Sequence, residues 1–226
     1  MALEVYQITA MIVVVGVALV YFKYIITRYP PLRMVRTIYT ISPAVVNHLR
    51  RLQYRSTMVH REMSGKIDLS DQEIVSIYVG GQNDSKMPSG CDVSYHTHYA
   101  KHGHEHDMLT MQDILGYKDF AIIAKYSALR KRPIVHLVAT PNFTYVVMIN
   151  SQLWNHIVTN KMTPWEVFHA IESQGQQIYL RMRSKLAIPS PATVREYNNS
   201  MIELGFVCEQ YDKSTREIKF TVDYPF

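Results

Sequence analysis

The apolar positions of residues 5–26 form one nearly uninterrupted run, broken only by Gln7, Thr9 and Lys23. About 20 helical residues are enough to cross the roughly 30 Å hydrocarbon core of a bilayer. A cleaved signal peptide would carry basic residues before the apolar run, but here only an acidic residue precedes it. The pattern therefore predicts a retained membrane anchor over residues 1–28, with residues 5–26 in the lipid bilayer.

Basic residues lie near the C-terminal end of the apolar run and just after it, and they determine its predicted orientation. They are Lys23, Arg28, Arg33 and Arg36. Because positive charge beside a span stays on the cytoplasmic side, we expect a single-pass membrane protein whose soluble domain faces the cytoplasm. Residues 29–36 form a linker, which Pro30 and Pro31 stiffen.

Helical and strand-like patterns alternate from residue 37 to residue 155. Ser42 and Pro43 are typical of a helix N-terminus, and the apolar positions after them have helical spacing. A second helix is predicted to begin at Thr110, because Thr110 and Asp113 can cap its first turn. Short strand-like runs, two of them flanking a turn at Pro141-Asn142, stand at residues 73–80, 92–95, 120–126, 133–139 and 144–149.

Residues 156–226 have longer helical patterns. Thr163, Pro164 and Glu166 form a capping-box sequence, which begins a helix that extends to about Lys185. We expect these C-terminal helices to pack on the preceding domain with an edge β-hairpin, and a winged helix is the alternative. The other predicted elements are a helix at residues 190–205 and hairpin strands at residues 206–211 and 217–222.

Composition adds limits to this mixed α/β chain. Of its 226 residues, 47% are hydrophobic and 19% are charged, which is typical of a folded protein. The net charge of +5 is modest, and a membrane explains several of the basic residues, so no nucleic acid is expected as a partner. A winged-helix nucleic-acid binder rests on the C-terminal third alone. Two cysteines, Cys91 and Cys208, form no disulfide framework and favour a reducing compartment.

The candidate chemistry is concentrated at His96-Thr97-His98. Side chains on a strand alternate between its two faces, so both imidazoles project to the same side. A catalytic zinc takes three protein ligands and leaves a fourth position for water. Asp113 lies downstream at the predicted helix start and supplies a carboxylate. His136, alone in an apolar strand, is predicted to be a hydrogen-bonded core histidine and not a ligand.

The order of these residues after an opening helix resembles the JAMM (JAB1/MPN/Mov34) zinc metalloprotease family over about residues 37–155. Glu62 comes first, then His96-x-His98, then Thr110-x-x-Asp113. The resemblance implies a cytidine-deaminase-like MPN core sheet flanked by helices. It also implies that the two histidines and Asp113 bind Zn²⁺.

The same resemblance gives roles to two more residues. It implies that Glu62 is the general base, and that Thr110 replaces the family's usual serine in stabilising the oxyanion. Glu73 is the second candidate for the base, although Ser70-x-x-Glu73 is also an ordinary capping box. Asp113 could also serve only as a helix cap.

The sequence departs from the family pattern in three places. Tyr99 replaces the proline that usually follows the second histidine, and Lys66 replaces an apolar residue after the glycine. The spacer between His98 and Thr110 is longer than the family's. Its extra polar residues could bind a second metal, replace a ligand, or form a solvated loop, which is the favoured interpretation. These residues are His102, His104, Glu105, His106 and Asp107.

Two functions follow as hypotheses. The first is a membrane-anchored JAMM-type zinc isopeptidase or peptidase, deubiquitinase-like, that hydrolyses ubiquitin-like or peptide substrates with metal-activated water. The second is a structural membrane protein with an MPN fold. Such a protein, with its assembly partners, would suit a minor capsid or inner-membrane protein of a large DNA virus, located in the virion.

Overall fold

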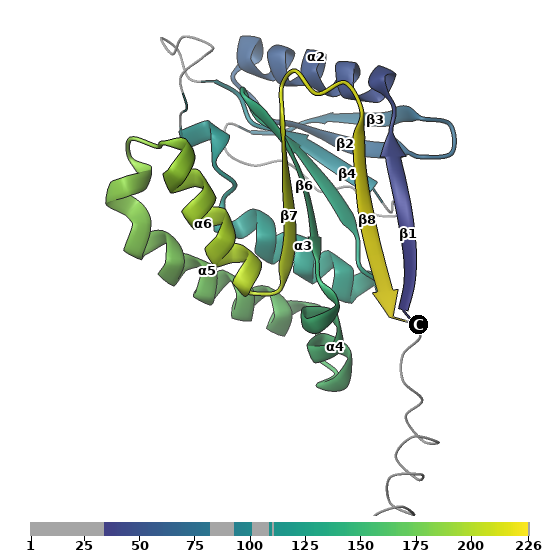
Figure 1. Ribbon diagram of the computed structural model, residues 1–226, viewed down its shortest axis with the longest axis vertical. Helices are drawn as coiled ribbons and strands as arrows, with labels where there is room; N and C mark the ends of the chain where they lie inside the picture. Colours follow the sequence, from purple (N-terminus) through teal and green to yellow (C-terminus); the bar gives the residue numbers. More distant parts are fainter. Residues whose placement is uncertain (1–33, 82–92, 101–108, 110, 226) are drawn as a thin grey trace, which may run out of the picture. The chain divides into compact units, whose positions relative to one another are not determined.

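A six-stranded mixed sheet, in the order β3-β2-β4-β5-β6-β7, is the framework of the protein (Figure 1). The computed structural model describes residues 34–81, 93–100, 109 and 111–225. The β4–β5 pair is parallel, and the other neighbouring pairs are antiparallel. The strands are β2 (Met63–Asp68), β3 (Glu73–Val79), β4 (Val93–Thr97), β5 (Val135–Ala139), β6 (Phe143–Ile149) and β7 (Phe206–Asp212).

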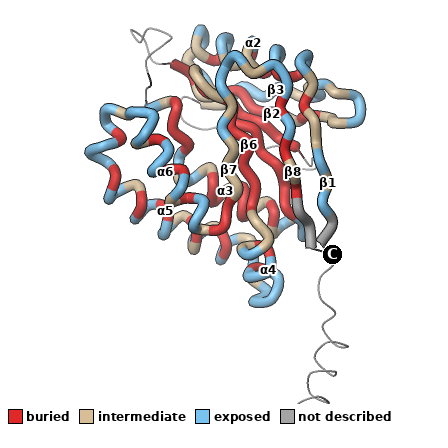
Figure 2. Tube along the Cα trace, viewed as in Figure 1, coloured by how far each residue is buried: buried red, intermediate tan, exposed pale blue. Residues whose placement is uncertain are grey.

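Helices cover both faces of this sheet within the compact unit Arg36–Tyr224. One face packs on α2 and on a two-stranded sheet formed by β1 and β8, and the other packs on α3, α4, α5 and α6. Figure 2 shows the central strands buried between these layers. The covering elements are β1 (Met34–Ile41), α2 (Pro43–Val59), α3 (Tyr117–Arg130), α4 (Ser151–Thr159), α5 (Pro164–Leu186), α6 (Pro191–Glu203) and β8 (Ile218–Pro225).

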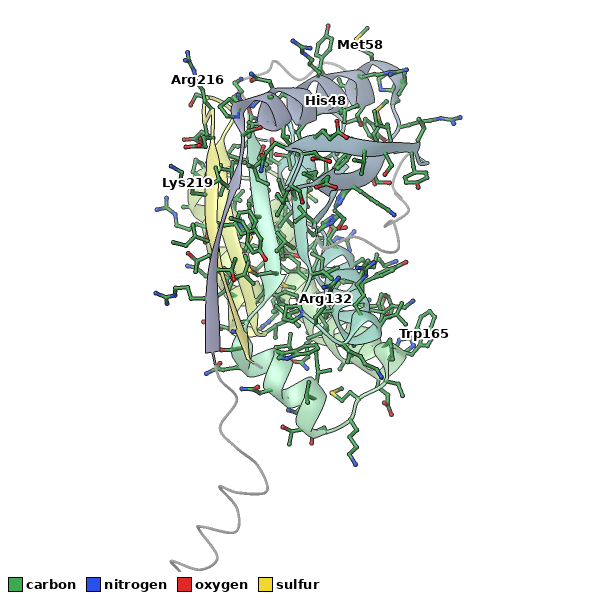
Figure 3. The ribbon with its side chains drawn as sticks, turned by 90° about the vertical axis from the view of Figure 1, so that its right-hand side faces the viewer. His48, Met58, Arg132, Trp165, Arg216 and Lys219 are labelled. Carbon is green, nitrogen blue, oxygen red and sulfur yellow. The ribbon has the colours of Figure 1, made fainter. Side chains whose placement is uncertain are left out.

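Two predicted helix starts are confirmed by their caps. The Ser42 hydroxyl accepts a hydrogen bond from the backbone N–H of Val45, and Pro43 is the first residue of α2. At the start of α5, Thr163 and Glu166 hydrogen-bond to each other's backbone N–H groups. Both caps satisfy amide groups that a helix N-terminus leaves unpaired. Viewed from the side, the exposed Trp165 side chain projects from this start of α5 (Figure 3).

The predicted strand at residues 120–126 is wrong, because these residues lie in helix α3. Phe120, Ala121, Ile123 and Ala124 are all buried, at spacings that form one helical face. A short apolar run fits a buried helix and a buried strand equally well.

The predicted start of this helix at Thr110 is also wrong. A 3-10 turn occupies Met111–Asp113, and α3 begins only at Tyr117, after Gly116 as its N-cap. Asp113 therefore precedes α3 and does not cap it. Thr110 lies outside the described residues.

The predicted terminal hairpin is wrong in its pairing. β7 pairs antiparallel with β6 in the large sheet, whereas β8 pairs with β1 in the small one. Ile218, Phe220 and Val222 of β8 are buried in the core beneath α2. After β7, the chain therefore leaves the large sheet, and β8 lies on the face of that sheet that α2 covers. The preceding helices α5 and α6 do pack back on the main unit, through α3 and β7, as the favoured interpretation expected.

No helix within the described ranges is long and apolar enough to cross a membrane. The predicted anchor, residues 1–28, and most of the linker lie outside those ranges.

Candidate metal centre

Strand β4 places His96 on the face of the sheet that packs against α3. Val93 and Tyr95 are buried in the core beneath α2, so Ser94 and His96, which alternate with them, face the other way. His98 follows two residues later, and its backbone N–H donates to the carbonyl of Ala139, continuing the β4–β5 pairing. The predicted same-side geometry is confirmed, because the Nε2 atoms of His96 and His98 are 3.0 Å apart.

The carboxylate that joins these two histidines belongs to Asp119. It lies in the first turn of α3, where one oxygen accepts a hydrogen bond of 2.8 Å from the Gly116 backbone N–H. Its oxygens lie 3.8 Å from Nε2 of His96 and 3.9 Å from Nε2 of His98. Among the described residues, these three side chains form a group that could hold a metal ion.

The separations of these atoms are close to those of a zinc site but do not yet match them. Two ligand atoms, each about 2.0–2.1 Å from a tetrahedral zinc, are about 3.3 Å apart. The two imidazole nitrogens are 3.0 Å apart, whereas the distances of 3.8 and 3.9 Å reach two different oxygens of Asp119, so the carboxylate would have to move closer to both rings to complete the geometry. Two imidazoles and one carboxylate also leave a fourth position for water, as catalytic zinc sites do.

The hydrogen bonds of His98 determine which of its nitrogens is available. Its Nδ1 atom lies 2.8 Å from the backbone carbonyl oxygen of Gln112, which can only accept. Nδ1 therefore carries a proton, and in the neutral ring the lone pair is on Nε2. This lone pair faces His96 and Asp119, which is the orientation of a metal ligand.

Burial keeps His96 and His136 neutral. Desolvation by burial lowers the pKa of His96 to about 4, and the opposing effect of the Asp119 charge does not compensate for it. Burial also lowers the pKa of His136 well below its ordinary value, and the neighbouring His96 and His98 lower it further. Neutral imidazoles are the form that binds metals.

Asp113, the predicted third ligand, is not part of this group. Its carboxylate is fully buried and accepts hydrogen bonds from the Thr140 hydroxyl and from the backbone and side-chain amides of Asn142. Its own carbonyl accepts from the Tyr145 hydroxyl. These bonds tie the 3-10 turn to the β5–β6 turn and give Asp113 a structural role, while its ligation of a metal stays a prediction.

Glu62 lies immediately before β2, the strand next to β4. Ser64 pairs with His96, and Met63 is buried in the core beneath α2, so alternation places Glu62 on the face that carries the histidines. It is half-buried and is not one of the three grouped ligands, which suits a base better than a ligand. Glu73 pairs with Asp68 at the opposite end of β2, about 20 Å along the strand at about 3.3 Å per residue.

Other residues named from the sequence have the following positions. Tyr99 is nearly buried, and its ring meets that of His60 edge-on. Lys66 pairs with Ser94 in the β2–β4 ladder. Outside the described residues lie Cys91, His102, His104, Glu105, His106, Asp107 and Thr110.

His136 is the partner of His96 that the sequence did not reveal. It is buried and hydrogen-bonded, as predicted for a core histidine, but one of its bonds reaches His96 directly. The sequence pattern does not indicate Asp119, because the apolar residues that follow it also fit a buried strand. Gly116-x-x-Asp119 at a helix start was the signal that could have identified it.

Comparison with known proteins gave no match. No protein-family model fits the chain, and no curated protein or solved structure is similar enough to be counted as a match.

Proposed function

We propose that this protein is a zinc-dependent hydrolase of the JAMM type, which cleaves a peptide or isopeptide bond. The observation that carries the proposal is the convergence of His96, His98 and Asp119, with Glu62 on the same face of the adjacent strand. A ligand set alone would also suit a structural metal. The open fourth position and the neighbouring carboxylate favour catalysis.

The resemblance to the JAMM family gains support from the order of elements along the chain. Helix α2 is followed by Glu62, by a strand with His96-x-His98, and by a helix whose first turn carries Asp119. In this arrangement Gly116 takes the place of the family's serine or threonine, three residues before the aspartate. A hydroxyl for the oxyanion must therefore come from elsewhere, and Thr110 remains the proposed donor.

The roles of the residues follow from their chemistry. When bound, zinc supplies a Lewis acid and lowers the pKa of water towards about 7. His96 and His98 bind through Nε2, and Asp119 contributes the negative charge. The Glu62 carboxylate accepts a proton from the attacking water and donates it to the leaving amine.

The test uses the full-length protein in a mild detergent, because residues 5–26 are predicted to enter a bilayer. We expect about one zinc per chain by elemental analysis, and cleavage of members of a panel of ubiquitin-like conjugates and peptides. Glu62→Gln is expected to keep the zinc and lose the activity, whereas Asp119→Asn is expected to lose both. Full activity in Glu62→Gln would contradict the assigned base.

A structural role is the second candidate, and one observation favours it. The edge strand β3 exposes 43–57% of Val75, Ile77, Tyr78 and Val79, an apolar edge suited to contact with another protein. In this case the protein would be a membrane-bound assembly subunit. Absence of zinc together with stoichiometric incorporation into a larger particle would favour it over the hydrolase.

A further inference from the structure

A continuous row of hydrogen-bonding atoms leads from the sheet interior to the metal centre. The Ser94 hydroxyl lies 2.7 Å from Nδ1 of His136, and Nε2 of His136 lies 2.6 Å from Nδ1 of His96. Nε2 of His96 then lies 3.0 Å from Nε2 of His98, whose Nδ1 meets the Gln112 carbonyl. Each contact is short enough for a hydrogen bond.

The proton positions along this row can be assigned when all three imidazoles are neutral and no metal is bound. The Gln112 carbonyl requires a proton on Nδ1 of His98, so Nε2 of His98 must accept. His96 then donates from Nε2 and accepts at Nδ1, and His136 likewise donates from Nε2. The Ser94 hydroxyl donates to Nδ1 of His136, so every contact in the row is satisfied.

A metal at the centre requires the opposite pattern at two of these rings. Nε2 of His96 must present its lone pair to the metal, so its proton moves to Nδ1. That proton is donated to Nε2 of His136, which must now accept and carry its own proton on Nδ1. The Ser94 oxygen accepts this proton, because a hydroxyl can act in either direction. Neither ring changes its charge.

We propose that His136 is a positioning residue of the metal centre, which, supported by Ser94, accepts the Nδ1 proton of His96 in the tautomer that makes Nε2 of His96 a ligand. The inference rests on the proposed metal site but not on hydrolysis. It assigns a reason for a buried contact between two imidazoles in the interior of the sheet. Partners of this kind orient metal-bound histidines, and their loss typically weakens metal binding about 10–100-fold.

The experiment combines zinc affinity with the tautomers of the histidines. Zinc Kd is measured by competition with a chromophoric chelator for the full-length protein in detergent at about pH 8, above the ordinary imidazole pKa of about 6.5. Tautomers are read from ¹⁵N chemical shifts of the ring nitrogens. We expect His96 and His136 to carry their protons on Nε2 without metal and on Nδ1 with zinc, while His98 stays protonated on Nδ1.

Three variants separate positioning from simple packing. His136→Phe fills the space without an acceptor and is expected to raise the zinc Kd about 10–100-fold. His136→Gln places an amide near the Nε2 position, where it can accept from His96, and is expected to restore most of the affinity. Ser94→Ala is expected to weaken binding. Its matched control is Ser56→Ala, which removes a buried hydroxyl that bonds to the Arg61 carbonyl and should leave the Kd unchanged.

The outcomes distinguish this inference from the proposed function. A folded His136→Phe protein with the wild-type zinc Kd would overturn the inference, even if hydrolysis is found. Zinc binding with the expected tautomers but without hydrolysis would support the inference and contradict the hydrolase. A wild-type protein that binds no zinc would overturn both.

Discussion

Asp113 and Asp119 give the sharpest separation of structural and metal-binding roles in this molecule. Replacing either one by asparagine removes one negative charge and nearly preserves side-chain shape. We expect Asp113→Asn to destabilise the fold and leave zinc binding intact. Asp119→Asn is expected to do the reverse.

The loss of stability expected for Asp113→Asn follows from the buried hydrogen bonds of its carboxylate. Among the described residues, three donors approach its carboxylate: the Thr140 hydroxyl at 3.1 Å and the two amides of Asn142 at 2.9 and 3.1 Å. A hydrogen bond to a charged group contributes about 1.5–3 kcal/mol and a neutral one about 0.5–1.5 kcal/mol. Losing about 1 kcal/mol at each bond lowers the free energy of unfolding by about 3 kcal/mol. At about 2–4 °C per kcal/mol, Tm falls by about 6–12 °C.

The effect expected for Asp119→Asn is on the stabilisation of the fold by bound zinc, which follows from mass action. Its carboxylate is only partly buried, and an asparagine oxygen can still accept from the Gly116 N–H, so metal-free stability changes by about 1 kcal/mol or less. Zinc at about 1,000 times Kd stabilises the wild-type fold by about 4 kcal/mol. If the variant binds zinc about 100-fold more weakly, the same zinc concentration stabilises it by only about 1.4 kcal/mol.

Thermal unfolding with excess zinc and with a chelator measures both effects in one experiment. The wild type and Asp113→Asn are expected to show the same zinc-dependent rise in Tm, from different starting points. The Tm of Asp119→Asn is expected to lie near the wild-type Tm with chelator and to rise little when zinc is added. The assignment of the ligand would be refuted if Asp113→Asn lost the zinc-dependent rise and Asp119→Asn kept it.

Three further predictions concern the scaffold. Gly65→Ala is expected to lower the free energy of unfolding in urea by at least about 3 kcal/mol, because the added methyl would overlap the carbonyl oxygen of Ser76. Burial raises the pKa of the Cys208 thiol to about 12, which leaves very little reactive thiolate at pH 8. Iodoacetamide should therefore alkylate Cys208 about a thousandfold more slowly in the native protein than in the unfolded protein. A Cys91→Ser variant removes the other thiol, so that only alkylation of Cys208 is measured. Thr163→Ala removes a helix cap and should lower the free energy of unfolding by about 1 kcal/mol, as measured by thermal denaturation.

The elements that could be predicted from sequence are those with local signals. Ser42 and Thr163 begin helices α2 and α5 where their capping chemistry indicates, because a cap depends on residues only three positions apart. The shared orientation of His96 and His98 is also local, since it follows from strand alternation. These positions depend on nothing distant in the chain.

The remaining features depend on contacts between distant residues. β8 follows β7 closely in sequence but pairs with β1, because its apolar residues fill the core beneath α2. The site shows the same limit. Asp119 could be recognised as the third member only once residues 120–126 were known to be helical, and the bond between His136 and His96 joins residues 40 positions apart.

The energetics of the buried row favour a role other than stabilising the fold. Ser94, His96 and His136 are each at most 4% exposed, on a sheet face whose other buried residues are largely apolar. Replacing two bonded polar partners by apolar groups of the same shape is nearly neutral or even stabilising. The row therefore adds little to the free energy of unfolding compared with an apolar core of the same shape. Its distinguishing property is at its open end, where His96 and His98 lie beside the Asp119 carboxylate in a group that could hold a metal ion.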